Sequence, residues 1–301
     1  MSEHVPPQFR VPPVDTVALE TRAAELATRS IKKAAKVRGL QLAIALMDLT
    51  TLEGADTPGR VRSLCQKARR PLPGRDDVPP VAAVCVYPDL VPAAVEALDG
   101  SGVRVAAVAT GFPSGRTDRA TKVHEAALAV AAGAHEIDMV IDRGAFLAGR
   151  YGEVWDEIRA VKDACGAAKL KVILETGELR TCDHARLACR IALLGGADFV
   201  KTSTGKVQPA STLPVALLLL ESVRDHFLAT GNFVGVKAAG GIRTAKDALR
   251  YLVLVNETCG DRWLCADGFR LGASSLLNDV IMQLEKERTG RYQRPSDFAV
   301  D

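Results

Sequence analysis

Two lysines stand at the ends of apolar segments, where their side chains could do chemistry. Lys201 ends the apolar run of ADFVKTSTGK, and Lys237 follows the next apolar run in GVKAAGG. A lone strand-end lysine most often reaches solvent, so neither residue indicates a site by itself. On adjacent strands, however, burial and a like-charged neighbour would both favour a neutral amine. A neutral lysine is the nucleophile that Schiff-base formation on a carbonyl substrate requires.

A carboxylate follows the same pattern. Asp138 lies at the end of the apolar run in HEIDMV. Alone, such a residue is usually explained by local hydrogen bonds. Close to two lysines, it becomes a candidate to carry protons during the reaction.

Two glycine-rich segments indicate a site for phosphate. Gly240-Gly241-Ile242-Arg243 and Gly272-Ala273-Ser274-Ser275 each precede a predicted helix. Glycines let backbone N–H groups approach an anion, and a helix N-terminus favours negative charge. Tight turns with a capping serine would explain each segment equally well, but the coincidence of both favours phosphate. Gly205 and Lys206 would complete this site.

A repeated strand-and-helix pattern along the chain would position these residues. From Gln41 onward, short apolar runs bounded by glycine, proline or polar residues alternate with stretches of helical composition. Runs that are apolar on both faces indicate buried parallel strands. The eight predicted strands lie at 41–49, 81–88, 103–112, 135–142, 170–177, 197–203, 232–241 and 268–275.

Eight units of about 31 residues each fit a TIM (β/α)8 barrel. An open, doubly wound sheet would also alternate, and periodicity alone does not exclude it. The polar residues favour the barrel, because they cluster at strand ends, where barrel enzymes place their sites. We therefore expect an N-terminal arm with a helix over residues 1–40, packed on the barrel. The helix of this arm is expected at about 16–36, capped by Asp15. The barrel itself is expected at 41–288, and a tail at 289–301.

Composition narrows the function further. The net charge is +3 with both signs interspersed, which does not indicate a nucleic-acid-binding face, and no apolar run is long enough to span a membrane. The N-terminal sequence lacks the pattern of a signal peptide. The seven cysteines are odd in number and form no CxxC pair, so we expect reduced thiols in the cytoplasm. The five histidines lack zinc spacing, and neither a metal nor a cofactor is expected.

Seven segments resemble the deoxyribose-phosphate aldolase family, whose members are TIM-barrel, metal-independent class I aldolases. The segments are MDLTTL (47–52), ATGFPSG (109–115), EIDMV (136–140), KVILETGEL (171–179), ADFVKTSTGK (197–206), KAAGGIRTAKDA (237–248) and FRLGASSLL (269–277). The resemblance implies reversible cleavage of 2-deoxy-D-ribose 5-phosphate to D-glyceraldehyde 3-phosphate and acetaldehyde. The implied partners are therefore small phosphorylated sugars and aldehydes, and a homodimer is compatible with the family.

The resemblance also implies roles for individual residues. It makes Lys201 the Schiff-base lysine, Lys237 the second lysine that perturbs its pKa and shares the proton relay, and Asp138 the proton donor and acceptor. The implied substrate contacts are Asp48, Thr50, Lys171, Thr204, Gly205, Lys206, Gly240, Gly241, Ile242, Arg243, Gly272, Ser274 and Ser275.

Two positions depart from the family's pattern. Family members often have proline after the second lysine, where this chain has Ala238, and some end in a tyrosine that reaches the site. This chain ends in Val300-Asp301, so the assistance that such a tyrosine gives would have to come from Tyr292, from solvent, or from no group at all. Other functions also fit this barrel mouth: a transaldolase-like transferase, a phosphosugar isomerase, or a catalytically silent sensor of sugar phosphates.

Overall fold

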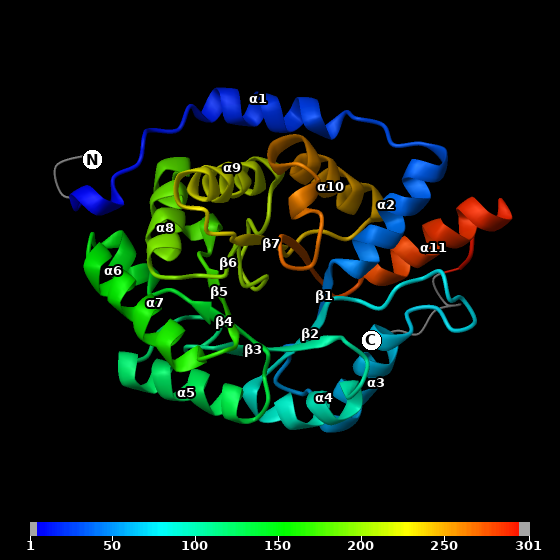
Figure 1. The fold of residues 1–301 in the computed structure, drawn as a ribbon, viewed down its shortest axis with the longest axis horizontal. Helices are drawn as coiled ribbons and strands as arrows, with labels where there is room; N and C mark the ends of the chain where they lie inside the picture. The colour runs from blue at the N-terminus through cyan, green and yellow to red at the C-terminus, as the bar shows by residue number, and fades with distance from the viewer. Residues whose placement is uncertain (1–4, 295–301) are drawn as a thin grey trace.

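Eight parallel strands form a closed barrel in the computed structural model, which describes residues 5–294. Each strand pairs with the next one along the chain, and β8 pairs with β1. Figure 1 shows the resulting barrel with its ring of helices. The prediction of a TIM barrel is confirmed. The strands are β1 (Met47–Thr50), β2 (Ala83–Val86), β3 (Arg104–Ala109), β4 (Glu136–Val140), β5 (Lys169–Ile173), β6 (Phe199–Lys201), β7 (Gly235–Ala239) and β8 (Phe269–Ala273).

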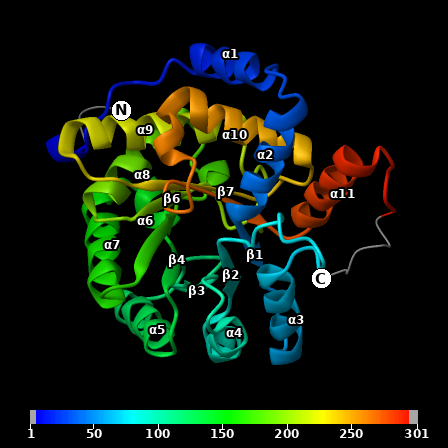
Figure 2. The same ribbon diagram turned by 45° about the vertical axis from the view of Figure 1, so that its right-hand side comes forward.

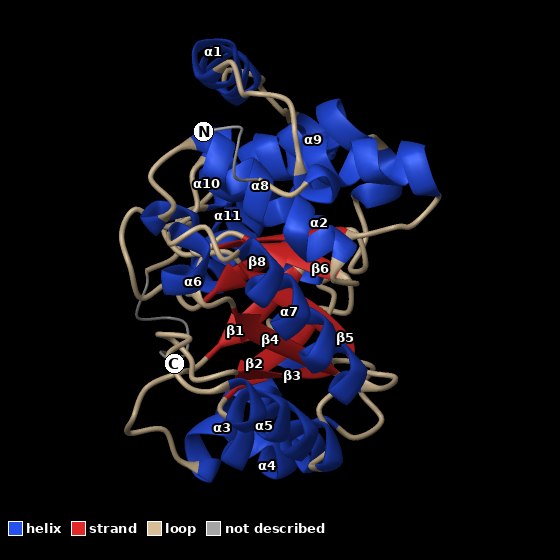
Figure 3. Ribbon diagram, turned by 90° about the vertical axis from the view of Figure 1, so that its left-hand side faces the viewer, coloured by secondary structure: helices blue, strands red, loops and turns tan. Residues whose placement is uncertain are grey.

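Helices surround the strands on the outside (Figure 3). They are α1 (Thr16–Ala27), α2 (Lys33–Ala45), α3 (Pro58–Arg69), α4 (Val91–Leu98), α5 (Arg119–Ala131), α6 (Arg143–Leu147), α7 (Tyr151–Cys165), α8 (Cys182–Leu194), α9 (Leu213–Thr230), α10 (Ala245–Cys259) and α11 (Leu276–Thr289). Many begin at a residue whose side chain accepts a hydrogen bond from the first turn, such as Thr181 of α8 and Thr244 of α10. Such caps satisfy amide groups that the helix leaves free, and so fix where each helix begins.

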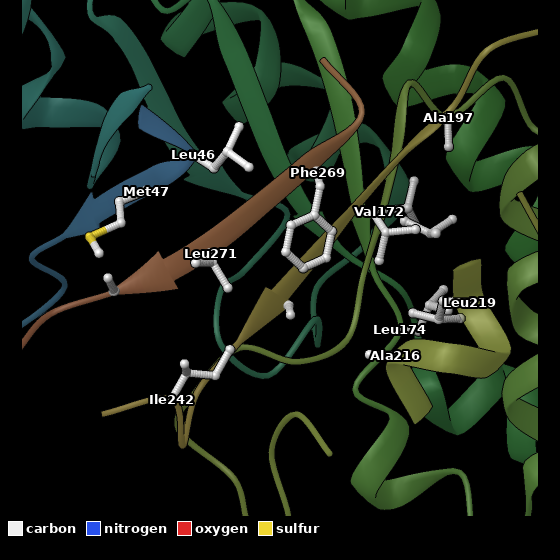
Figure 4. Close-up of a cluster of buried hydrophobic side chains, with 14 of the residues drawn as sticks. Leu46, Met47, Val172, Leu174, Ala197, Ala216, Leu219, Ile242, Phe269 and Leu271 are labelled. Carbon is white, nitrogen blue, oxygen red and sulfur yellow. The ribbon is translucent and has the colours of Figure 1, made fainter. Parts of the chain in front are cut away.

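Alternation along the strands separates an apolar layer from a polar interior. Side chains that point outward from the strands, such as Val172, Phe269 and Leu271, pack with helix residues such as Leu219 of α9 (Figure 4). The intervening positions point into the barrel, because successive strand residues face opposite sides. Most charged residues of the strands occupy these inward positions and are buried, whereas Arg104 and Lys169, at the first positions of β3 and β5, are partly exposed.

The N-terminal segment differs from the prediction in two ways. The expected single helix after Asp15 is two helices, of which α1 packs on α9 and α10 outside the barrel (Figure 2). Asp15 caps α1 as expected. The expected start of the first strand at residue 41 is wrong, because α2 continues to Ala45. Leu40, Ala43 and Ile44 are buried at helical spacing, so this apolar run also suits a helix.

The structure also shows the state of the cysteines, the character of the helices and part of the expected C-terminal tail. All seven cysteines are free; Cys265 is exposed, Cys182 and Cys259 are partly buried, and the other four are buried. Every helix among residues 5–294 is too short or too polar to cross a membrane. Of the tail expected at 289–301, Thr289 ends α11, and residues 295–301 lie outside the described part of the chain.

Candidate active site

Lys201 and Lys237 converge on one oxygen atom. They are direct partners in the register of β6 and β7, so their side chains enter the barrel at the same height. The Nζ atom of Lys201 lies 2.8 Å from Asp138 Oδ2, and that of Lys237 lies 2.9 Å from the same oxygen. Both lysines are almost fully buried, and Asp138 is fully buried. The structure thus brings together the three residues that were predicted to act on substrate.

The two lysines are nevertheless unequal. Lys237 also pairs with Asp48, at 2.7 Å, whereas Asp138 is the only carboxylate paired with Lys201 among the described residues. Burial lowers the pKa of Lys201, and the charge of Lys237 lowers it further against the opposing effect of Asp138. For Lys237, burial is outweighed by Asp138 and Asp48, which raise its pKa. Lys201 is therefore the lysine that gives up its proton more readily.

Asp138 is held as an anion by three lysines. Lys171 donates to its other oxygen, Oδ1, at 2.8 Å. Burial alone would raise the pKa of Asp138, but the ammonium groups of Lys171, Lys201 and Lys237 outweigh it and hold that pKa well below its usual range. When Lys201 becomes neutral, one of these cations is lost, and Asp138 accepts a proton more easily.

Further buried charges extend this cluster, and sequence reasoning missed two of them, Glu136 and Arg270. Glu136 pairs with Lys171 and with Arg270, whose Nη2 is 2.8 Å from Glu136 Oε1, and Arg270 also pairs with Asp48. All four side chains are fully buried. Asp48 and Lys171, expected as substrate contacts, belong to this cluster: Lys171 pairs with Asp138, and Asp48 pairs with Lys237. The carboxylates are matched by cations, and the described residues contain no group of three potential metal ligands.

A pocket of about 230 Å³ opens above the two lysines. It brings together most of the predicted substrate contacts, including Thr50, Thr204 and Ile242. Asp48, Asp138 and Lys171 do not line it, because they lie deeper in the barrel. The predicted contacts that line the pocket are Thr50, Thr204, Gly205, Lys206, Gly240, Gly241, Ile242, Arg243, Gly272, Ser274 and Ser275.

One side of the pocket is suited to an anion. Gly240 and Gly241 have φ angles of +79° and +81°, which glycine adopts without strain. A Cβ on Gly240 would lie 2.6 Å from that of Ala210, so only glycine fits there. Lys206 and Arg243 bring positive charge to this side. Lys206 is not free, however, because its Nζ pairs with Glu53 at 2.7 Å, and Glu53 was not predicted from the sequence.

Glu175, which sequence reasoning also missed, positions the loop after Lys201. Its carboxylate accepts hydrogen bonds from the backbone N–H of Thr204 at 3.2 Å and from the Thr204 hydroxyl at 2.5 Å. Glu175 is fully buried and has a left-handed backbone with φ of 53°. This φ is uncommon for a residue other than glycine and indicates that the surrounding contacts fix the conformation.

Tyr292 does not take the place of a tyrosine at the site. Its side chain is 73% exposed and lies over Lys286 of α11, with that Nζ 4.0 Å from the ring centre. It is absent from the lining of the pocket. Residues 300 and 301, where the departure from the family pattern was noted, lie outside the described residues.

Comparison with known proteins agrees with this arrangement. Residues 42–280 match the model of the DeoC/LacD family aldolases. The chain belongs to this family. The aldolase is 47% identical to the deoxyribose-phosphate aldolase of Mus musculus over 95% of this chain and 93% of that protein. It is 46% identical to the human deoxyribose-phosphate aldolase with the same coverage.

A solved structure shows the same fold. The deoxyribose phosphate aldolase of Aeropyrum pernix, described as a tetramer, superposes with a TM-score of 0.60 at 25% identity. The match covers 86% of this aldolase and all of that chain. The matched part of the chain contains every lysine and carboxylate of the buried centre, so the family and the geometry bear on the same residues.

Proposed function

We propose that this aldolase reversibly cleaves 2-deoxy-D-ribose 5-phosphate to D-glyceraldehyde 3-phosphate and acetaldehyde through a Schiff base on Lys201. The observation that supports the proposal most directly is the pair of lysine amines on one oxygen of Asp138, at the floor of an anion-binding pocket. Class I aldol chemistry needs a neutral amine at a carbonyl carbon and a proton carrier beside it. The curated relatives named above carry this activity.

In the first step, the neutral amine of Lys201 attacks C1 of the open-chain aldehyde. Loss of water then gives an iminium ion, which accepts the electron pair of the C2–C3 bond as that bond breaks. The C3 hydroxyl loses its proton, and D-glyceraldehyde 3-phosphate leaves. The enamine that remains takes up a proton at C2, and water hydrolyses the resulting iminium to acetaldehyde and the free lysine.

Asp138 and Lys237 serve the proton transfers. Asp138 lies within hydrogen-bond distance of the Lys201 amine and relays protons to and from the substrate through a water molecule. Lys237 keeps its proton at neutral pH, since its pKa is raised by Asp138 and Asp48 against the effect of burial. It therefore acts mainly as a fixed positive charge that favours neutral Lys201 and orients the Asp138 carboxylate.

The phosphate group orients the substrate. Lys206, Arg243 and the backbone at Gly240-Gly241 would bind it on one side of the pocket, with C1 toward Lys201. Binding at a distance from the reacting carbon holds C1 near the amine and so contributes to catalysis. Because Lys206 pairs with Glu53 in the free protein, phosphate has to take over this lysine from the carboxylate.

Reductive trapping tests the proposal. The protein is incubated with acetaldehyde and borohydride, digested, and analysed by mass spectrometry, in parallel with a cleavage assay coupled to detection of glyceraldehyde 3-phosphate. We expect one ethyl adduct on Lys201 and cleavage of deoxyribose 5-phosphate. An adduct confined to another lysine would reject the assignment of the nucleophile. Trapping on Lys201 without cleavage would reject the substrate and favour another phosphosugar enzyme with the same mouth.

A further inference from the structure

A second hollow lies outside the barrel, where the N-terminal arm crosses α8 and α9. This arm pocket has a volume of about 240 Å³. Three arginines and a histidine line it, namely Arg10 of the arm, Arg186 and Arg190 of α8, and His226 of α9. Its apolar lining includes Val11 and Leu193. The pocket shares no lining residue with the barrel mouth, so it is a separate feature of the molecule.

The arm is fixed on both sides of this pocket. Before Arg10, Phe9 is buried, and its ring lies 6.1 Å from that of Trp155 in α7. After Pro12, the backbone N–H of Val14 donates to Asp183 of α8 at 2.7 Å. Each anchor holds the chain against a helix of the barrel. The segment between them is therefore held across the pocket, and the pocket is preformed.

Positive charge in the arm pocket exceeds the negative charge available to it. Asp225 is the one carboxylate among the described lining residues, and Arg224 already pairs with it at 2.8 Å. Arg186 faces Glu221 at 3.6 Å, but that carboxylate also pairs with Arg22.

Two arginines have no carboxylate partner within residues 5–294. Arg10 makes one hydrogen bond, to the carbonyl of Val5 at 3.2 Å. Arg190 has a buried Nε without a hydrogen-bond partner and makes no ion pair in this part of the chain. Arginines without a carboxylate partner in a shared pocket favour the binding of an anion.

A buried histidine points to a ligand independently. His226 is 7% exposed and lines the arm pocket, and its Nδ1 atom has no hydrogen-bond partner in the described structure. Burial and the nearby Arg190 both lower its pKa, so the ring is neutral near pH 7. A neutral imidazole can carry its proton on Nδ1 and donate it to an anion. A buried polar atom without a partner is costly, and a turn of the ring that brings Nδ1 to a bound anion would remove this cost.

We propose that the arm pocket binds a small organic anion, with its phosphate or carboxylate group between Arg10 and Arg190 and beside the ring of His226. The rest of the ligand lies against Val11 and Leu193. Arginine favours such oxyanions, because its planar fork donates two parallel hydrogen bonds. The apolar lining favours an organic anion over a bare inorganic ion. A ligand here joins the arm to α8 and α9, and so reduces the opening of the arm.

Hydrogen-exchange mass spectrometry tests the proposal on the full chain, with phenyl phosphate and benzoate as probes and phenol as the uncharged control. Peptides covering the arm at residues 8–15 report on the arm pocket, and peptides covering residues 203–209 report separately on the barrel mouth. We expect both anions, but not phenol, to slow exchange in the arm. Arg190→Gln should weaken this protection about tenfold or more in ligand concentration. Arg62→Gln, which changes an arginine of α3 that pairs with Glu96, should leave it unchanged.

Arg10→Gln is the second variant, because Arg10 is exposed and makes a single hydrogen bond, so we expect its replacement to leave the fold intact. Arg10→Gln should also weaken the protection of residues 8–15 by the two anions. The test can therefore be carried out with this variant if Arg190→Gln does not fold. Two results would overturn the proposal: an arm whose exchange is unaffected by about 10 mM of either anion, or protection that is equal in wild type and Arg10→Gln. Protection confined to residues 203–209 would likewise place all anion binding at the barrel mouth.

Discussion

The buried charges of the barrel and the pocket above them differ in how their charged groups are paired. In the buried centre, Asp138, Lys171 and Glu136 are fully enclosed and satisfied by direct ion pairs with one another and with neighbouring cations. In the pocket, glycines and half-exposed cations such as Lys206 leave room for a ligand. The first arrangement fixes the protonation states of the buried lysines and carboxylates. The second lets a substrate phosphate replace the carboxylate of Glu53 at Lys206.

Because of this difference, we expect mutations in the two regions to change different kinetic constants. A change in the buried centre alters the pKa values and geometry of the reacting groups and should appear in kcat or in stability. A change at the rim alters how firmly phosphate is held and should appear mainly in KM. The mutations below test that separation, beginning with the largest expected effect.

Lys201→Met removes the amine that forms the Schiff base. We expect kcat to fall by about 10³-fold or more and the borohydride adduct to disappear, because Lys201 is the one buried lysine of residues 5–294 that lines the pocket and has a lowered pKa. The matched control is Lys169→Met, which changes a lysine at the opposite end of the barrel that pairs with Asp267 at 2.7 Å. If Lys201→Met still formed the adduct, the nucleophile would be another residue.

Lys171→Met tests how much of the fold depends on the charges below the site. It removes the buried cation that pairs with both Asp138 and Glu136, so we expect the free energy of unfolding to fall by about 3–5 kcal/mol. Urea unfolding measures this loss. Lys36→Met, which breaks a partly exposed pair with Glu287, should cost less than about 1 kcal/mol. Equal losses in the two variants would show that the buried network has no special part in stability.

Lys237→Leu removes the second charge beside Lys201. Because the charge of Lys237 lowers the pKa of Lys201, its removal should raise the pH at which adduct formation reaches half its maximum. Below that pH more Lys201 is protonated, and we expect turnover near neutral pH to fall by about 10²-fold. The measurement is the rate of imine trapping as a function of pH, with Lys246→Leu as an exposed control. An unchanged profile would leave burial as the sole cause of the lowered pKa.

Glu53→Gln should have the smallest effect and the opposite sign. It removes the carboxylate that pairs with Lys206 in the free protein, so phosphate no longer competes with it. We expect the inhibition constant of inorganic phosphate to fall about two- to fivefold with kcat unchanged, since an exposed ion pair contributes little. Glu96→Gln, which changes an exposed glutamate paired with Arg62, is the control. A weaker phosphate affinity in Glu53→Gln would mean that Glu53 supports the anion site.

The strands and the lysine pair could be predicted because each depends on a local pattern. Apolar runs marked the eight strands, and two runs ending in lysine one unit apart placed Lys201 and Lys237 side by side, as their register confirms. The helix over 41–45 could not be separated from a strand, because a short apolar run such as LQLAIA satisfies both periods.

The deeper charges were harder to predict because a strand pattern gives the face of a residue but not its height. Asp48 and Lys171 were expected to contact substrate, yet they are fully buried and do not line the pocket. A signal for Glu136 was available, since it shares the inward face with Asp138 two residues later. For Glu53 and Glu175 no such signal exists, because loop conformation alone brings them to Lys206 and Thr204.

The distribution of the thiols has a practical consequence for spectroscopy. Cys265 is the one exposed cysteine of the seven, and it lies before β8, at the end of the barrel opposite the mouth. A maleimide dye should therefore attach there first, in the natural sequence and without engineered sites. It would report on tumbling, association and unfolding while leaving the chemistry at the other end undisturbed.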